Sequence, residues 1–218
     1  MSFLYRRNQI TKMEIQQAID NLQREADYKI KQPLQYSFGE KAECRALLEK
    51  IFIQTDKTIK KFQWLPEYDQ VVDWMSDNQG KGLALHGACG RGKSIILKQV
   101  LPVLFRMKGK LFRPIKAEDL ALLPRTSKTE TTLSGYCKKT KFIGIDEFGR
   151  ERMGNDFGVK FEALDYVIDY CESNLSQPLF LTSNMDREQI TKRYGDHIFD
   201  RIQRLCKIVV FNGESLRQ

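Results

Sequence analysis

The sequence has few residues of the kinds that form disulfides or bind metals through sulfur and nitrogen. Its 218 residues include five cysteines and two histidines, and no pair of cysteines has the C-x-x-C spacing. An odd number of scattered cysteines argues against a disulfide framework, and so few histidines argue against a structural zinc site. We expect neither feature in this protein.

Long hydrophobic runs, repeats and low-complexity tracts are also missing. No apolar run approaches the roughly 18 residues that a membrane-spanning helix needs. The first nine residues contain Arg6 and Arg7, but the apolar segment of a secretory signal does not follow them. We therefore expect a cytoplasmic protein without membrane contacts.

The composition excludes a disordered chain, because 41% of the residues are hydrophobic and 29% are charged. The 36 Lys and Arg exceed the 28 Asp and Glu, which gives a formal net charge of +8. A basic balance suits a polyanionic partner. A charge of this size is equally an ordinary solubility charge, so the sum alone decides nothing.

The beginning of the chain predicts helices. Apolar residues recur near helical spacing over residues 11–31 and 40–62, and Pro66 opens a short third helix that ends at 78–80. From Gly82 onward, short apolar runs alternate with helical stretches at 93–107, 117–123, 157–174 and 186–203. The apolar runs cover residues 83–86, 111–115, 142–146, 179–183 and 208–211.

This alternation predicts an α/β fold, with a mostly parallel five-stranded sheet that helices cover on both faces. The pattern changes near residues 62–66. We therefore expect a small helical region over residues 1–61 and an α/β domain over residues 62–218. Pro102 should kink or shorten the helix at 93–107.

A phosphate-binding loop is predicted directly after the first strand. Residues 87–94 read GACGRGKS and match G-x-x-x-x-G-K-[ST] in full, between a strand and a helix as the mechanism requires. Lys93 is expected to reach the β and γ phosphates of ATP, and Ser94 to bind Mg²⁺. The residues expected at the nucleotide are Gly87, Ala88, Cys89, Gly90, Arg91, Gly92, Lys93 and Ser94.

Two adjacent carboxylates follow the third apolar run, at Asp146 and Glu147. An apolar strand that ends in two acids is typical of a Walker B segment. Asp146 would then hold Mg²⁺, and Glu147 would polarise a water for attack on the γ phosphate. A pair of adjacent acids favours hydrolysis by water over transfer to a small acceptor.

The fourth apolar run leads into Ser183 and Asn184. Parallel sheets place ligands at the carboxyl ends of their strands, so Asn184 could orient the attacking water. Alternatively, Ser183 or Asn184 caps the helix that follows. The pattern by itself does not separate these two interpretations.

The phosphate loop, the Asp-Glu pair and the polar end of the next strand together resemble the AAA+ ATPases. Residues 194–202 (YGDHIFDRI), 208–217 (IVVFNGESLR) and 145–149 (IDEFG) are similar to segments of DnaC-type helicase loaders and their IstB-type transposition-helper relatives. The resemblance covers about residues 62–218 and does not extend to residues 1–61.

The resemblance implies roles for further residues. Asn184 matches the sensor-1 position, Arg217 matches the sensor-2 arginine that reads the γ phosphate, and Arg201 matches the arginine finger that completes a neighbour's active site. A finger that acts in trans implies self-association. Arg204 lies one helical turn from Arg201 and competes for the same role. Without the resemblance, both arginines would be taken as part of a solvated basic face.

The printed sequence runs only a few residues past the fifth apolar run, from which we expect a module without the helical lid of most AAA+ proteins. By likeness to the loaders, residues 1–61 would dock on a replicative helicase. Packing of these helices on one another or on the ATPase core is an equally good interpretation.

The resemblance also implies single-stranded DNA as a ligand, bound without sequence preference. A compact basic cluster fits this, with Phe105 and Phe112 interleaved; its members are Arg106, Lys108, Lys110, Arg113 and Lys116. Phe112 is expected in the core rather than on DNA. A second candidate is Lys138–Lys141, which a solvated turn explains better. Binding should depend strongly on salt.

We interpret the sequence as that of an ATP-dependent loader of a replicative helicase that uses ATP and Mg²⁺. The nearest alternative is an IstB-like transposition helper with the same ATPase chemistry. A P-loop kinase of a small metabolite is a third hypothesis, against which Asp146, Glu147 and Arg217 speak. A binding-only switch that barely hydrolyses ATP is a fourth.

Overall fold

The computed structural model describes residues 12–24, 32–55, 62–125, 132–156 and 159–216. The chain divides into two compact units, Met1–Gln32 and Pro33–Gln218. The described part of the first unit is helix α1 (Lys12–Arg24), on which Met13 and Ile15 are exposed. Within the described ranges, no helix has the length and apolar character that crossing a membrane requires.

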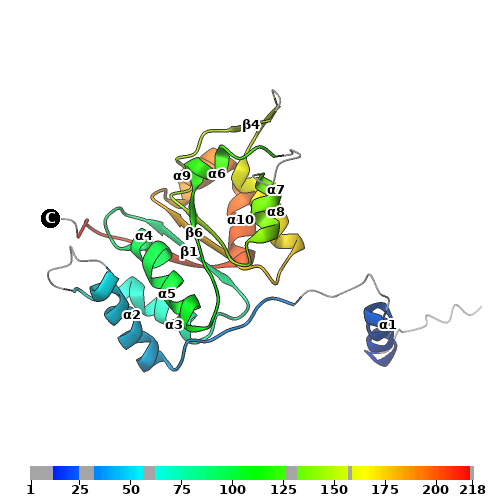
Figure 1. Cartoon of the computed structure of the whole chain (residues 1–218), viewed down its shortest axis with the longest axis horizontal. Helices are drawn as coiled ribbons and strands as arrows, with labels where there is room; N and C mark the ends of the chain where they lie inside the picture. Colours follow the sequence, from blue (N-terminus) through cyan, green and yellow to red (C-terminus); the bar gives the residue numbers. More distant parts are fainter. Residues whose placement is uncertain (1–11, 25–31, 56–61, 126–131, 157–158, 217–218) are drawn as a thin grey trace, which may run out of the picture. The chain divides into compact units, whose positions relative to one another are not determined.

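The second unit is built on a five-stranded sheet with the order β2-β3-β6-β1-β7, in which all neighbouring strands are parallel (Figure 1). Strand β1 lies between β6 and β7, so the loop after β1 opens between the carboxyl ends of these two strands. The strands are β1 (Gly82–Gly87), β2 (Ile115–Lys116), β3 (Ile143–Asp146), β6 (Leu179–Ser183) and β7 (Cys206–Phe211).

Helices cover both faces of this sheet, because successive side chains of each strand point to opposite sides. Leu83 and Leu85 of β1 belong to one buried cluster, and Ala84 between them belongs to the other. The first face carries α2 (Lys41–Thr55), α3 (Pro66–Ser76), η1 (Ile96–Val100) and α5 (Leu101–Met107). The short helix α4 (Lys93–Ile95) directly precedes η1.

The second face carries the later helices, which contribute most of the second buried cluster. They are α6 (Ala117–Ala121), α7 (Leu133–Lys139), α8 (Ala163–Ser173), α9 (Arg187–Tyr194) and α10 (Asp196–Leu205). The observed architecture is thus the α/β fold that the alternation predicts, with five parallel strands between two helical layers.

Helix α2 belongs to the compact second unit rather than to a separate N-terminal region. Its Leu48 and Phe52 are fully buried in the same cluster as Trp74 of α3 and Leu97 of η1. The division between compact units falls between Gln32 and Pro33, thirty residues before the boundary that composition indicates. The functional division at residue 62 stays a prediction.

Several element boundaries differ from the predicted ones. The strand expected at 111–115 is reduced to Ile115–Lys116, because Pro114 offers no N–H and the ring of Phe112 turns into the aromatic core. The helix expected at 186–203 is broken at Gly195, whose φ is +88°. Pro102 does not shorten its helix, which continues to Met107 after the π-helical turn η1.

The segment after β3 holds the largest difference. Instead of a helix from residue 157, the chain forms the antiparallel pair β4 (Gly154–Asp156) and β5 (Val159–Phe161), and α8 begins only at Ala163. A Cβ atom on Gly154 would lie 2.5 Å from the ring of Phe161, so this ring packs directly against the glycine. Helix α7 was not expected from the sequence.

Candidate nucleotide-binding site

The predicted phosphate loop connects β1 to α4, as the sequence pattern requires. Gly87 has φ +110°, and a Cβ atom there would lie 2.4 Å from the carbonyl oxygen of Phe211. Only glycine therefore allows the loop to leave β1 so close to β7. Gly90 and Gly92 also have positive φ, and Cys89 between them and the strand is exposed.

The side chain of Lys93 folds back against the beginning of the phosphate loop. It is 5% exposed, and its ammonium donates hydrogen bonds to the carbonyl oxygens of Gly87 at 2.9 Å and Ala88 at 2.6 Å. The ammonium is therefore held at the loop's own backbone, where it can meet the phosphate oxygens that such a loop binds.

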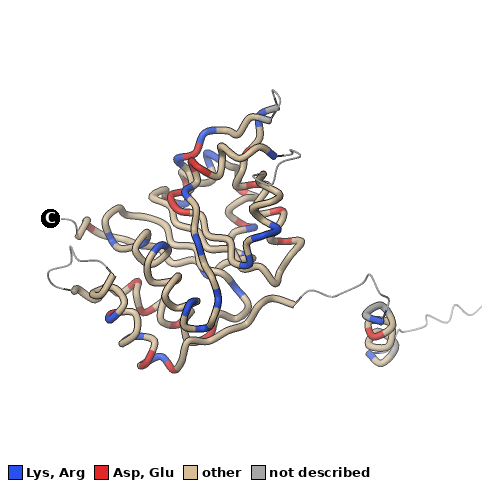
Figure 2. The backbone as a smooth tube through the Cα atoms, viewed as in Figure 1, with Lys and Arg blue, Asp and Glu red and all other residues tan. Residues whose placement is uncertain are grey.

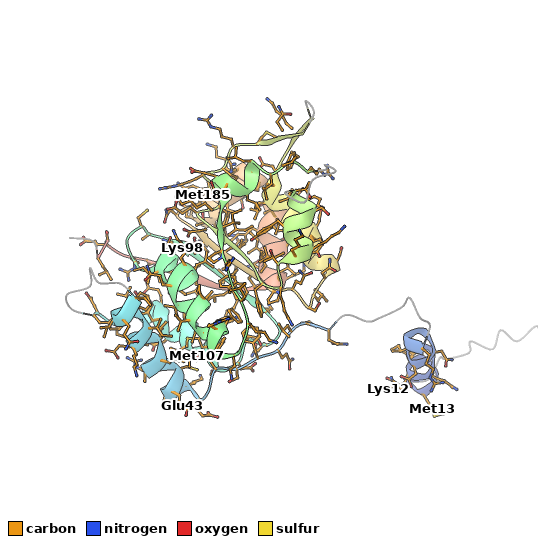
Figure 3. All side chains as sticks on the ribbon, in the orientation of Figure 1. Lys12, Met13, Glu43, Lys98, Met107 and Met185 are labelled. Carbon is orange, nitrogen blue, oxygen red and sulfur yellow. The ribbon has the colours of Figure 1, made fainter. Side chains whose placement is uncertain are left out.

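Ser94 and Asp146 are brought together by the parallel sheet. The Ser94 hydroxyl donates to Oδ1 of Asp146 at 2.9 Å, and Thr182 on β6 donates to the same oxygen at 2.5 Å. Lys98 Nζ lies 3.4 Å from Oδ2 on the other side of the carboxylate (Figure 3 labels Lys98). Hydroxyl and carboxylate oxygens suit Mg²⁺, which completes its shell with water and phosphate oxygens.

Glu147 has an unusual backbone. Its φ is +59°, a left-handed conformation that costs free energy for a residue with a side chain. Its N–H donates to Oγ1 of Thr182 at 2.9 Å, which helps to hold the turn. The carboxylate is one-third exposed and lies 3.3 Å from Nη1 of Arg150. Glu147 therefore faces solvent just beyond Asp146, where a water could be activated.

Asn184 lies at the end of β6, half-buried, and lines a cavity of about 630 Å³ together with Gly87 and Ala88. The helix that follows is capped by Asp186, which forms a capping box with Gln189. The alternative role predicted for Asn184 and Ser183, as the cap of this helix, is therefore wrong.

His86, the next-to-last residue of β1, lines the same cavity. It is 5% exposed and packs edge-on against the ring of Phe199 at 6.0 Å between centroids. Burial lowers the pKa of His86 below its ordinary value. The imidazole therefore resists protonation beside a loop built to attract anions.

Comparison with known proteins bears on the fold. No protein-family model and no curated protein matches the sequence. Among solved structures, DnaI is 19% identical, with a TM-score of 0.52 over 75% of this chain and 93% of its own. The DnaC helicase loader is 18% identical, with a TM-score of 0.48 over 81% of this chain and 93% of its own.

AMPPCP-bound DnaA from Aquifex aeolicus is 14% identical, with a TM-score of 0.45 over 69% of this chain and 48% of its own. The likeness to DnaI agrees with the parallel sheet and the phosphate loop described above. This chain shares the fold of DnaI. The α/β fold class predicted from the sequence is confirmed, and the predicted resemblance to helicase loaders is supported at the level of the fold.

Within this fold, Arg201 is held by acidic side chains of α8. Its guanidinium donates to Glu172 at 2.9 Å, to Asp165 at 2.9 Å and to Asp169, and the side chain is 14% exposed. Burial alone would lower the pKa of Arg201, but the hydrogen bonds to Glu172 and Asp169 raise it. Arg204 is 69% exposed and contacts Glu172 at 3.1 Å. Arg217, the third predicted arginine, lies outside the described residues.

The basic cluster at residues 106–116 begins in the last turn of α5 and continues through the segment that leads to β2 (Figure 2). All five of its basic side chains are exposed. Phe105 and Phe112 are buried in the aromatic core, so neither of these two rings can stack on a base. The rings of Phe105 and Phe142 stack there with 4.2 Å between centroids. Met107 and Leu111 are the exposed apolar residues of the segment.

Sequence reasoning missed three residues that contact the site. Thr182 and Lys98 contact Asp146. Glu67 contacts Arg91. Thr182 leaves a trace in the sequence as one of two hydroxyl residues at the end of an apolar strand. Lys98 and Glu67 leave none, because ordinary surface positions on helices carry the same residue types.

Proposed function

We propose that this protein hydrolyses ATP and uses the nucleotide cycle to load a replicative helicase onto single-stranded DNA. The observation that carries the ATPase part is the contact of Ser94 with Asp146, which joins the phosphate loop to the Asp-Glu pair. The loader part rests on the resemblance of residues 62–218 to DnaC-type loaders and on the shared fold.

In this proposal the phosphates of ATP bind to the backbone N–H groups of residues 87–94 and to Lys93. Lys93 exchanges its hydrogen bonds with Gly87 and Ala88 for phosphate oxygens. Ser94 and Asp146 would hold Mg²⁺, which supplies charge neutralisation at the β and γ phosphates when it is bound.

Glu147 accepts a proton from the attacking water, and Asn184 orients that water from the neighbouring strand. Glu147 contacts Arg150, whereas Asp146 contacts Ser94, so the two carboxylates have different neighbours and can take different roles. Arg150 must release the Glu147 carboxylate before it can act as a base. The contact is exposed, and such contacts contribute little free energy.

Hydrolysis would be completed by an arginine from a neighbouring copy of the chain. Arg201 is the residue that the family resemblance indicates, and its use would require release from Asp165, Asp169 and Glu172. Arg204 is the alternative, since it is more exposed and has fewer acidic partners. Arg217 would read the γ phosphate within its own subunit.

The helicase would dock on the N-terminal unit, residues 1–32, and DNA on the basic cluster. This narrows the docking region expected from the sequence, because α2 is buried in the core of the second unit. On α1, Met13 is 78% exposed and Ile15 is 50% exposed, which suits an apolar partner groove.

The test combines nucleotide turnover with partner capture. The full chain should hydrolyse ATP, should retain a replicative helicase in a pull-down, and should lose the helicase but not ATP binding when residues 1–32 are deleted. Lys93→Ala is the matched control, which should lose ATP binding. Capture of a transposase instead would favour the transposition-helper function, and phosphorylation of a small acceptor would favour a kinase.

A further inference from the structure

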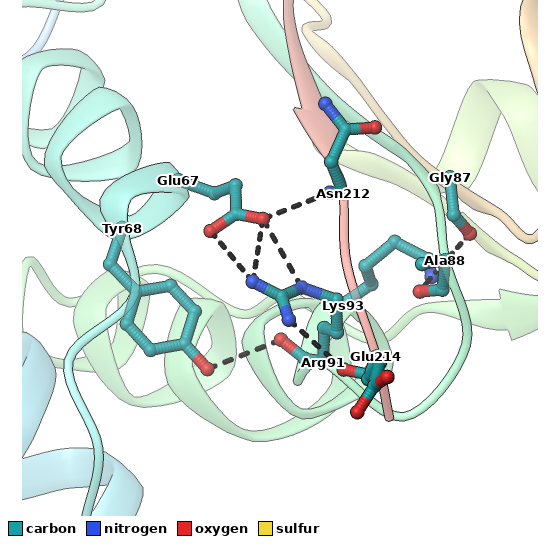
Figure 4. A network of polar contacts seen from close by, with 8 residues as sticks. All are labelled: Glu67, Tyr68, Gly87, Ala88, Arg91, Lys93, Asn212 and Glu214. Atoms are coloured by element: carbon teal, nitrogen blue, oxygen red, sulfur yellow. Dashed lines mark hydrogen bonds and ion pairs between the residues drawn. The ribbon is translucent and has the colours of Figure 1, made fainter. Parts of the chain in front are cut away.

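Three segments that are distant in the sequence meet at the side chain of Glu67 (Figure 4). Oε1 accepts from Nε of Arg91 at 3.1 Å and from Nη2 at 2.8 Å, and Oε2 accepts from Nη2 at 3.1 Å. Oε1 also accepts from the backbone N–H of Asn212 at 2.9 Å. Glu67 belongs to α3, Arg91 to the phosphate loop and Asn212 to the segment after β7.

The pair is buried. The side chain of Arg91 is 9% exposed and that of Glu67 is 8% exposed. Removing two charges from water is costly, and apolar residues of similar size often give equal stability at such positions. What an apolar pair cannot provide is direction, because planar guanidinium and carboxylate groups fix each other's orientation through several hydrogen bonds.

The other contacts of the loop extend this fixation to both sides. Nη1 of Arg91 donates to the carbonyl oxygen of Glu214 at 3.0 Å, and the N–H of Leu216 donates to the carbonyl oxygen of Gly90 at 3.1 Å. On the α3 side, the hydroxyl of Tyr68 donates to the carbonyl oxygen of Arg91 at 3.2 Å. Successive residues of the phosphate loop are thus tied to the segment after β7 and to α3.

Gly92 shows how closely α3 approaches the loop. A Cβ atom on Gly92 would lie 2.7 Å from the hydroxyl of Tyr68 and 3.2 Å from the ring of Phe52 on α2. The loop therefore passes directly over the helical layer formed by α2 and α3. A displacement of α3 relative to the sheet would be transmitted to the loop through Glu67 and Tyr68.

We propose that Glu67 is a positioning residue of the nucleotide site, which sets the phosphate loop through Arg91 and the segment after β7 through Asn212. The inference rests on the proposed binding of ATP at this loop. Glu67 acts on the geometry of the loop's N–H groups and touches no phosphate. Since these N–H groups bind the phosphates before and during hydrolysis alike, its loss should weaken binding more than it slows the chemical step.

The first test compares Glu67→Gln with Asp73→Asn. Asp73 lies on the same helix as Glu67, and its replacement removes only an exposed ion pair with Lys41 of α2. Glu67→Gln should weaken ATP binding about tenfold, by analogy with the loss of affinity when residues that orient metal ligands are removed. Its kcat at saturating ATP should stay within about threefold of the unmodified protein. Asp73→Asn should leave both values unchanged.

A second measurement reports on the loop without nucleotide. Cys89 is exposed and the other four cysteines are buried, so a thiol reagent should modify Cys89 first. The modification rate of Cys89 should change severalfold in Glu67→Gln and stay constant in Asp73→Asn. This rate tests the proposal even if ATP does not bind, so a failure of the proposed ATPase function can be recognised separately.

The double variant Glu67→Met with Arg91→Met addresses the possibility that a single change unfolds the protein. Replacement of both charges by apolar residues should preserve folding. The positioning role is supported if this variant has the melting temperature of the unmodified protein, binds ATP about tenfold more weakly and shows an altered rate of Cys89 modification. A stable double variant with unchanged ATP affinity and an unchanged Cys89 rate would overturn it.

Discussion

The hydroxyl of Ser94 lies 2.9 Å from Oδ1 of Asp146, although 52 residues separate the two in the sequence. Strand β6 lies between β1 and β3, so the two residues approach each other across the carboxyl edge of the sheet. Thr182, on the intervening strand, donates to the same carboxylate oxygen. The contact links the phosphate loop to the acidic pair, which the first two predictions address.

The first prediction concerns the proposed base. Glu147→Gln should lower the rate of ATP hydrolysis by about 10²- to 10⁴-fold, because an amide cannot accept the proton of the attacking water. Binding of ATP should remain, since the phosphate loop is unchanged. Turnover and equilibrium binding are measured on the same preparation. Unchanged turnover would remove Glu147 from catalysis, and no turnover in the unmodified protein would favour a binding-only switch.

The second prediction concerns Thr182, whose Oγ1 donates to Asp146 and accepts from the N–H of Glu147. Thr182→Val keeps the shape but removes both hydrogen bonds. We expect the free energy of unfolding to fall by about 1–3 kcal/mol, because buried polar groups lose their partner. The Mg²⁺ concentration needed for half-maximal hydrolysis should rise. Thr55→Val, which removes a hydroxyl from the end of α2, should leave that concentration unchanged.

The third prediction separates Arg201 from Arg204. Arg201→Ala should lower the melting temperature, because three carboxylates of α8 lose their shared cation. Arg204→Ala should melt like the unmodified protein. If Arg204 serves a neighbouring subunit, its loss should reduce hydrolysis in the assembled protein and leave ATP binding intact. Mixing Arg204→Ala with Glu147→Gln subunits should restore part of the activity, and failure to do so would exclude Arg204.

The fourth prediction concerns the basic cluster. Replacement of Lys108, Lys110 and Arg113 by Gln should weaken single-stranded DNA binding and reduce its dependence on salt. The slope of log K against log salt should fall by up to about 2, at roughly 0.7 for each lost phosphate contact on a single strand. Replacement of the lysines within 138–141 by Gln is the matched comparison. Equal affinity and equal slope for the first variant would leave the net charge of +8 as a solubility charge.

The fifth prediction follows from His86, whose pKa is lowered by burial from an ordinary value of 6.5. As the pH falls through 6.5, the unfolded chain takes up a proton that the folded chain refuses, so the free energy of unfolding decreases. One linked proton gives a slope of at most about 1.4 kcal/mol per pH unit. His86→Gln should show a smaller slope between pH 7 and pH 5 in denaturant titrations. Identical slopes for the two proteins would contradict the assignment.

Features that depend on contiguous residues could be predicted from the sequence. The phosphate loop needs its glycines, Lys93 and Ser94 in fixed order between a strand and a helix, and the structure places them there. Helix α3 begins at Pro66, as expected. The parallel sheet also followed from the alternation of short apolar runs and helices, because that pattern has few topological solutions.

Contacts between distant residues could not be predicted in this way. The choice of Asp186 as the cap of α9 and the early end of the strand near Phe112 depend on neighbours from other segments. The acidic partners of Arg201 come from α8, a helix that was predicted with a different start. Spacing along the chain contains no information on which charged side chains will meet once helices pack together.

Local backbone geometry and hydrophobic periodicity are enough to predict the phosphate loop, the acidic pair and the alternation of strands with helices. The packing of α2 and α3 against the loop, and the contacts of Glu67 with the loop and with the segment after β7, appear only in the folded chain. A buried ion pair forms where packing brings two charges together out of water, and that depends on the whole fold.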